Sequence, residues 1–186
     1  MTPAEELAPI LARFGLVDVT VRPVEGGHIN RSWKIVPRSP WPASEPDRGP
    51  RRGTGSFLLQ RINPLVFRNG ELVLQNVAAV CDHLGKSALR LELDQPERRV
   101  MRLVRASNGL PGVKADDGAW WRLLGYIEDA DAHQRAESPD LAREAGRAFG
   151  LFQRLLADYN GPTLAETIPG FHDTRLRIVS ARVGPL

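Results

Sequence analysis

The chain has 186 residues, of which 42% are hydrophobic and 25% are charged, and its formal net charge is only +3. This composition is typical of a globular protein with a hydrophobic core and excludes an intrinsically disordered chain. One basic cluster, formed by Arg48, Arg51 and Arg52, lies in a segment rich in proline and glycine. A nucleic-acid-binding face needs a larger concentration of basic residues, so nucleic acid is not expected as a partner, and binding of an anion or nucleic acid through this cluster is kept as a minor alternative.

The single cysteine, Cys81, excludes an intrachain disulfide and favours a reducing compartment. The first residues are acidic and lack the apolar run of a signal peptide. No stretch reaches the ~20 apolar residues that are needed to cross a bilayer. We therefore expect a cytoplasmic protein with no membrane partner.

The N-terminal part of the chain predicts one helix followed by three strands. Thr2 and Glu5 have the spacing of a capping box, and Gly15 should end the helix. Pro9 should kink or shorten it because proline removes a backbone hydrogen bond. Alternating apolar residues then predict strands at 19–25, 29–36 and 56–62.

The segment 37–55 between the second and third strands is rich in proline, glycine and arginine and has no periodicity. Such a composition buries too little apolar surface to offset the entropy of ordering it. We predict a flexible loop here.

Two more helices and two more strands follow. Apolar residues at helical spacing predict a helix at 69–86 that packs on the sheet through Val73, Val77, Val80 and Leu84. Alternation predicts strands at 99–105 and 119–127. Ser138 followed by Pro139 predicts the start of a last helix, whose buried face would contain Leu141, Ala145, Ala148, Phe149, Phe152, Leu155 and Leu156. The fold class is therefore α+β, with an antiparallel sheet of about five strands.

A Gly26-Gly27 turn joins the first two strands, and Arg61 ends the third. Two glycines let the backbone approach a ligand closely and direct its amides at an anion. A cation on a nearby strand can contact the same anion. A plain hairpin and a surface arginine are the alternatives, and the local pattern alone leaves them open.

Five short segments, taken in order, resemble the aminoglycoside phosphotransferase superfamily, and within it most closely the N-acetylhexosamine kinase branch of the phosphotransferase enzyme family. The resemblance extends over residues 19–174. The matching segments are Gly26-Gly27-His28-Ile29-Asn30-Arg31-Ser32, Leu58-Leu59-Gln60-Arg61-Ile62-Asn63 with Val66-Phe67, Gln75-Asn76-Val77, Trp121-Arg122-Leu123 with Tyr126-Ile127-Glu128, and Ile168-Pro169-Gly170-Phe171-His172-Asp173-Thr174.

The resemblance implies a protein-kinase-like N-terminal lobe at 1–127, then a hinge and the truncated start of a C-terminal lobe at 128–186. It implies that the glycine turn lies over the phosphates of ATP, that Arg61 replaces the third-strand lysine of kinases, and that the hinge meets the adenine ring. The implied nucleotide-binding residues are Gly26, Gly27, His28, Asn30, Arg61, Tyr126 and Glu128. The acid that should orient Arg61 would come from the helix at 69–86, where Gln75 and Glu71 stand near the expected place; Asn76 could instead be a bridging amide.

The superfamily carries its catalytic aspartate and its magnesium-binding aspartate in the large lobe. His172-Asp173 does not supply them, because position 178 is an isoleucine where the motif has asparagine. We assign no catalytic residue and no metal ligand to this chain; ATP and Mg²⁺ are implied by the family alone.

We therefore expect part of an ATP-dependent kinase of sugars or aminoglycosides, inactive by itself, that ends before the catalytic loop. The alternatives are a non-catalytic kinase-like binding or interaction module and the product of a broken gene. In each case the apolar face of the last helix is expected to promote self-association.

Overall fold

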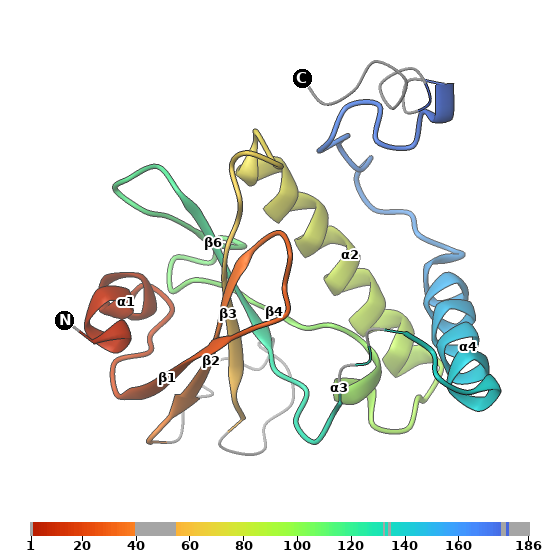
Figure 1. Cartoon of the computed structure of the whole chain (residues 1–186), viewed down its shortest axis with the longest axis horizontal. Helices are drawn as coiled ribbons and strands as arrows, with labels where there is room; N and C mark the ends of the chain where they lie inside the picture. The colour runs from red at the N-terminus through yellow and green to blue at the C-terminus, as the bar shows by residue number, and fades with distance from the viewer. Residues whose placement is uncertain (1, 40–54, 132, 134, 176–177, 179–186) are drawn as a thin grey trace.

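The computed structural model describes residues 2–39, 55–131, 133, 135–175 and 178. It confirms an α+β fold built on an open antiparallel sheet, with α1 and α2 on opposite sides of the sheet (Figure 1). Most of the predicted loop at 37–55 and the whole basic cluster fall on residues 40–54, outside the described residues.

The sheet has six strands rather than about five. Five of them form the order β1-β2-β3-β6-β4, and β5 pairs with β6 beside β4. Every described strand pair is antiparallel. The strands are β1 (Val19–Val24), β2 (Arg31–Pro37), β3 (Phe57–Arg61), β4 (Leu103–Val104), β5 (Val113–Lys114) and β6 (Trp120–Gly125).

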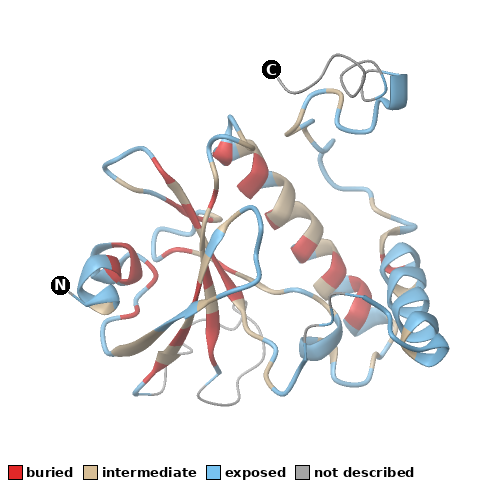
Figure 2. Cartoon of the chain, in the orientation of Figure 1, coloured by how far each residue is buried: buried red, intermediate tan, exposed pale blue. Residues whose placement is uncertain are grey.

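The main core lies between α1 (Pro3–Ala12) and the face of the sheet that α1 covers. The strands contribute alternate residues to this core, as expected where side chains alternate between two faces. Figure 2 shows buried residues concentrated in the central strands and along one side of α1. The core residues from the strands are Trp33, Ile35, Phe57, Leu59, Val104, Val113, Trp121 and Leu123.

Helix α1 begins as the sequence predicts. The Thr2 side chain accepts a hydrogen bond from the Glu5 amide, and the Glu5 carboxylate accepts one from the Thr2 amide. The helix ends at Ala12, earlier than predicted, and Pro9 lies inside it. Pro9 is exposed, so water can solvate the carbonyl that it leaves without a partner.

Helix α2 (Gly70–Arg90) is longer than the predicted helix at 69–86. It runs between the sheet and the last helix (Figure 1), so more than one of its faces is covered. Val73 and Leu84 are buried as predicted, whereas Val77 and Val80 are half-buried. The sequence pattern predicted one buried stripe on α2. It missed four further buried residues beside that stripe, namely Leu74, Ala78, Cys81 and Ala88.

The predicted strand at 99–105 is mostly wrong. Only Leu103 and Val104 are paired, and a short helix, α3 (Pro96–Arg99), takes up the preceding residues. Proline at the first position favours this helical turn. The unpredicted strand β5 pairs with the same edge of β6. Because β4 and β5 share that edge, neither extends beyond two residues.

The last helix, α4 (Pro139–Leu156), starts where predicted, and the Ser138 hydroxyl accepts a hydrogen bond from the Leu141 amide at 3.1 Å. Of its predicted apolar face, only Leu155 is buried among the described residues, and the exposure of the rest agrees with the expectation that this face is available for self-association. Phe149 and Phe152 are 72% and 46% exposed, and most of α4 is exposed in Figure 2. Self-association through this face stays a prediction.

The segment after α4 returns to α2. The Asn76 amide group donates a hydrogen bond to the Ala165 carbonyl at 2.8 Å and accepts one from the Ala165 amide at 2.9 Å. The sequence left open whether Asn76 is a bridging amide, and these bonds confirm that it is. One side chain therefore ties α2 to a segment 89 residues further along the chain.

Candidate functional site

The predicted nucleotide-binding residues lie at two ends of the central strands. At one end is the glycine turn, where Gly26 has a φ of 89°, a conformation that favours glycine. The turn is fixed to the end of β3, because the side-chain oxygen of Asn30 accepts a hydrogen bond from the backbone amide of Asn63 at 3.0 Å. The Asn63 side chain also donates to the Ile29 carbonyl at 3.1 Å.

Gly26, Gly27 and His28 are exposed in this turn. Within the described ranges, no protein acceptor is recorded for the amides of Gly27, His28 and Ile29. These amides are therefore available to solvent, as they would be in a plain hairpin, and their binding of phosphate stays a prediction.

At the other end, Tyr126 and Glu128 follow β6. The Lys34 ammonium group donates to the Glu128 carboxylate at 2.6 Å and lies 4.3 Å from the centre of the Tyr126 ring. The hydrogen bond from Lys34, followed by one from the Ser56 hydroxyl, lowers the pKa of Glu128 below its ordinary value. Lys34 was not predicted as a site residue, although its place in a strand next to the glycine turn could have suggested it.

Arg61 does not lie on the α2 side of the sheet, where the resemblance would put a phosphate-binding cation. It shares its face with Leu59 and the α1 core, and its guanidinium group donates to the Asp117 carboxylate at 3.0 Å. The pKa of Asp117 is lowered, first by the Ala119 amide and then by Arg61. Glu71 and Gln75 are exposed residues of α2 on the other side, so neither orients Arg61.

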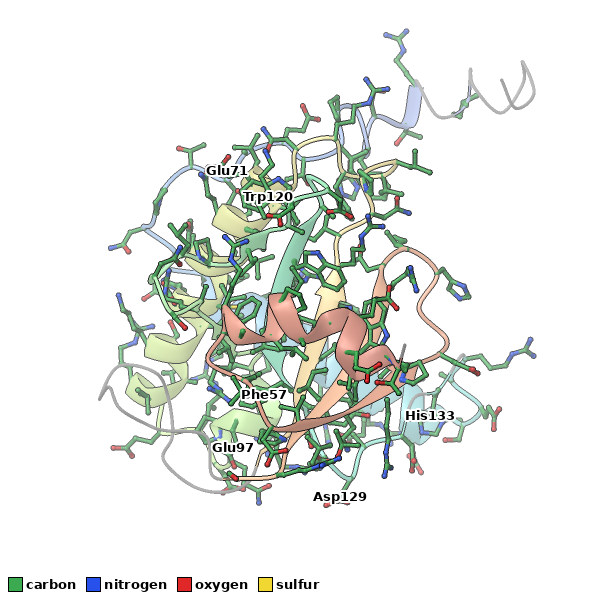
Figure 3. All side chains as sticks on the ribbon, turned by 90° about the vertical axis from the view of Figure 1, so that its left-hand side faces the viewer. Phe57, Glu71, Glu97, Trp120, Asp129 and His133 are labelled. Atoms are coloured by element: carbon green, nitrogen blue, oxygen red, sulfur yellow. The ribbon has the colours of Figure 1, made fainter. Side chains whose placement is uncertain are left out.

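Figure 3 views the molecule with α1 in front and shows how the two ends are separated. Glu71 and Trp120 lie together at one end, at the starts of α2 and β6, and Asp129 lies at the opposite end. The glycine turn and the connector after β6, where the sequence predicts nucleotide-binding residues, are thus separated by the length of β3, at ~3.3 Å per residue.

Between these ends, the α2-facing side of the sheet carries a polar row. Ser32, Gln60 and Arg122 are cross-strand neighbours on β2, β3 and β6. Arg122 donates to the Gln60 carbonyl oxygen at 2.9 Å, and the Gln60 amide group donates to the Ser32 hydroxyl at 2.9 Å. Burial lowers the pKa of Arg122 from its ordinary value. We call Ser32, Gln60 and Arg122 the polar row.

Cys81 lies near Arg122 on the same side of the sheet. Burial first, and then the Asp82 charge, raises the pKa of the Cys81 thiol from 9.0 to about 11, although Arg122 opposes the change. Since the thiolate is the reactive form, native Cys81 should hold about a hundredfold less thiolate at pH 8 than an ordinary cysteine.

We therefore expect native Cys81 to react with a thiol reagent at pH 8 at least a hundredfold more slowly than the same cysteine in denaturant. Stopped-flow or manual labelling with a chromogenic disulfide measures both rates, and no other cysteine contributes. Equal rates in the two conditions would contradict the burial of this thiol.

No known family model matches the sequence. In the described part of the chain, no group of three or more His, Cys, Asp or Glu side chains could hold a metal ion. Nor does that part contain a helix with the length and hydropathy of a membrane span.

Proposed function

We propose that this chain is the nucleotide-binding lobe of an ATP-dependent phosphotransferase that acts on a small, sugar-like molecule. The observation that carries the proposal is the glycine turn and the Lys34–Glu128 pair at the two ends of the same strands, with the polar row between them. This spacing suits an extended nucleoside triphosphate, with its phosphates at the turn and its base at the connector.

The strand order supports the same proposal. Three antiparallel strands followed by a long helix and further strands of the same sheet agree with the arrangement that the resemblance implies for a kinase-like small lobe; the structure adds α3 and the short strand β5 to it. The longest helix, α2, follows β3 as that arrangement requires. A hairpin alone would not account for this order.

The structure favours a different set of binding groups from the one that the resemblance gives. On the α2-facing side, the strand cations include Arg22, Lys34 and Arg122, whereas Arg61 is on the other face. We propose that the amides of Gly27 and His28 bind phosphate. Lys34 and Tyr126 would contact the base and ribose, and the polar row would lie beneath the middle of the nucleotide.

Phosphoryl transfer also needs a catalytic aspartate and magnesium-binding carboxylates. The sequence motifs that carry these carboxylates in the superfamily were not found in this chain, so we assign no metal ligand to it. We propose that this chain supplies nucleotide binding and that transfer depends on a second lobe. A binding module with the same nucleotide site and no transferase activity is the alternative, and activity with a sugar acceptor separates the two.

Mg-ATP is expected to bind the 186-residue chain with a millimolar dissociation constant, because one lobe covers only one side of a ligand that such sites usually enclose. Backbone amide shifts in an NMR titration should identify the turn around Gly26 and Gly27. Lys34→Ala should weaken binding roughly fivefold, the effect of about one lost hydrogen bond of ~1 kcal/mol.

Two matched variants test on which face of the sheet the nucleotide binds. Arg61→Ala should change the dissociation constant less than twofold if the nucleotide lies on the α2 side, and so should Arg38→Ala, which removes an exposed pair with Asp18. If Arg61→Ala abolishes binding and Lys34→Ala does not weaken it, the proposed face is wrong. If no amide of the turn shifts with Mg-ATP, the proposed function is wrong.

A further inference from the structure

A cavity of about 460 Å³ lies on the α1-facing side of the sheet, opposite to the proposed nucleotide site. Its walls include the apolar residues Leu7 and Ile10 of α1, and Trp33 and Trp121 of the sheet, but charged side chains make up about half of the residues that line it. The volume falls in the range of small-molecule sites, which combine an apolar lining with a few polar groups.

Three side chains form a row of hydrogen-bond donors at this cavity. Arg31, Arg61 and Trp121 are cross-strand neighbours on β2, β3 and β6, and all three line the cavity. Because directly opposite residues point to the same face of a sheet, the three side chains project from the same face. We call these three residues the donor row.

The indole N–H of Trp121 lacks a hydrogen-bond partner. Trp121 is only 6% exposed, and its Nε1 is the one buried side-chain nitrogen or oxygen without a partner in the described part of the chain. A buried donor without an acceptor costs free energy, and native structures usually satisfy such groups. The Nε1 atom itself exposes less than 1 Å² to solvent, so an acceptor in the cavity would satisfy it only after the side chains around it shift.

The arginines add positive charge around the same place. The guanidinium group of Arg31 lies 5.2 Å from the centre of the Trp33 ring, and none of the described acids forms an ion pair with it. A guanidinium that stacks on an aromatic ring keeps its N–H groups available for a carboxylate. Arg61 already pairs with Asp117, and Arg13 donates to the Lys114 carbonyl.

We propose that this cavity binds a small aromatic carboxylate. The carboxylate would accept hydrogen bonds from the donor row, and the aromatic ring would pack against Trp33, Leu7 and Ile10. Glu6, Asp116 and Asp117 also line the cavity, and all three are exposed. Their negative charges disfavour a phosphate dianion more strongly than a carboxylate with one charge. This site is independent of the proposed nucleotide site, since it lies on the other face of the sheet.

A titration with 2-naphthoate tests the proposal, with 2-naphthamide as the neutral isostere and inorganic phosphate as the dianion. The ¹H–¹⁵N resonance of the Trp121 indole, assigned with Trp121→Phe, should move downfield and saturate with 2-naphthoate. Naphthamide should bind at least tenfold more weakly. Phosphate should not saturate the shift in the same concentration range.

Arg31→Ala should weaken 2-naphthoate binding at least tenfold, because Arg31 is exposed and its loss should leave the fold intact. Arg22→Ala is the matched control, an exposed arginine of β1 that does not line the cavity, and it should leave binding unchanged. The absence of a saturable Trp121 shift, equal binding of the amide, tighter binding of phosphate, or an unaffected Arg31→Ala variant would each overturn the proposal. In a parallel titration, Mg-ATP should shift the amide resonances of the glycine turn and leave the Trp121 indole resonance unchanged. The nucleotide site and the carboxylate site can therefore be disproved independently of each other.

Discussion

Leu123→Ala is expected to lower the free energy of unfolding by about 3 kcal/mol, within the usual range of 2–5 kcal/mol for buried leucines. Leu123 is 0% exposed and lies at the centre of β6, between Leu59 of β3 and Val104 of β4. The change removes buried apolar atoms and leaves a cavity that strands held on both sides cannot close. Denaturant unfolding followed by circular dichroism measures the loss.

Leu65→Ala is the matched control for this change. Leu65 is 90% exposed, so the same truncation should alter the free energy of unfolding by less than about 0.5 kcal/mol. Because a domain of this kind is stable by only ~5–15 kcal/mol, the Leu123 variant should show a clear shift of its midpoint. Equal effects of the two changes would contradict the position of Leu123 in the core.

Gly112→Ala should be comparably destabilising, by about 3 kcal/mol, at the upper end for overpacking. A Cβ at this position would lie 2.4 Å from the Trp121 carbonyl oxygen and 2.6 Å from a methyl group of Leu74. The carbonyl belongs to the backbone of β6, so it cannot move aside as the end of a side chain could. The substitution therefore forces β5 away from β6 or α2 away from the sheet.

Gly85→Ala is expected to raise the free energy of unfolding, whereas Gly112→Ala lowers it, and it serves as the comparison. Gly85 lies inside α2, and a Cβ there meets nothing within 4 Å. Alanine in a helix interior is better than glycine by ~0.5–1 kcal/mol, so this variant should be more stable than the parent chain. Thermal unfolding of the two alanine variants side by side tests both statements, and a stable Gly112→Ala variant would contradict the close approach of β5 to β6.

Local signals predicted the starts of helices well, because a cap depends on a few neighbouring residues. Thr2 with Glu5, and Ser138 with Pro139, mark the observed first residues of α1 and α4. The first three strands also lie where alternation predicted them. The short strands β4 and β5 could not be predicted in this way, since two-residue pairs carry no period.

The faces of the strands were harder to predict than their positions. Phe57, Leu58 and Leu59 form a continuous apolar run, which hides the side on which Arg61 points. The structure resolves this ambiguity because Leu59 is 0% exposed in the α1 core, and Arg61 must follow it. Gln60 then occupies the α2-facing side, so no acid of α2 can orient Arg61 as the resemblance implies.

Helix α4 shows a third limit of prediction. Its apolar stripe is real in the sequence, yet Phe149 and Phe152 remain exposed. A hydrophobic pattern indicates that a face can be buried and does not identify what covers it. The position of α4 is instead set by its C-terminal end, where the His83 ring contacts the Leu155 carbonyl at 3.1 Å and Arg90 pairs with Asp158.

The two indole rings of the α1-facing core also have an optical consequence. The ring centres of Trp33 and Trp121 are 5.5 Å apart, and the planes are tilted by 32°. Strong transitions of two chromophores at this distance and tilt couple, and they split into bands of opposite sign in the far-ultraviolet circular dichroism spectrum. This couplet will overlap the signal of the helices, so an ordinary estimate of helix content from the spectrum will be biased. It will also disappear when the rings separate, and its loss will report melting of the core beside α1 independently of α2 and α4.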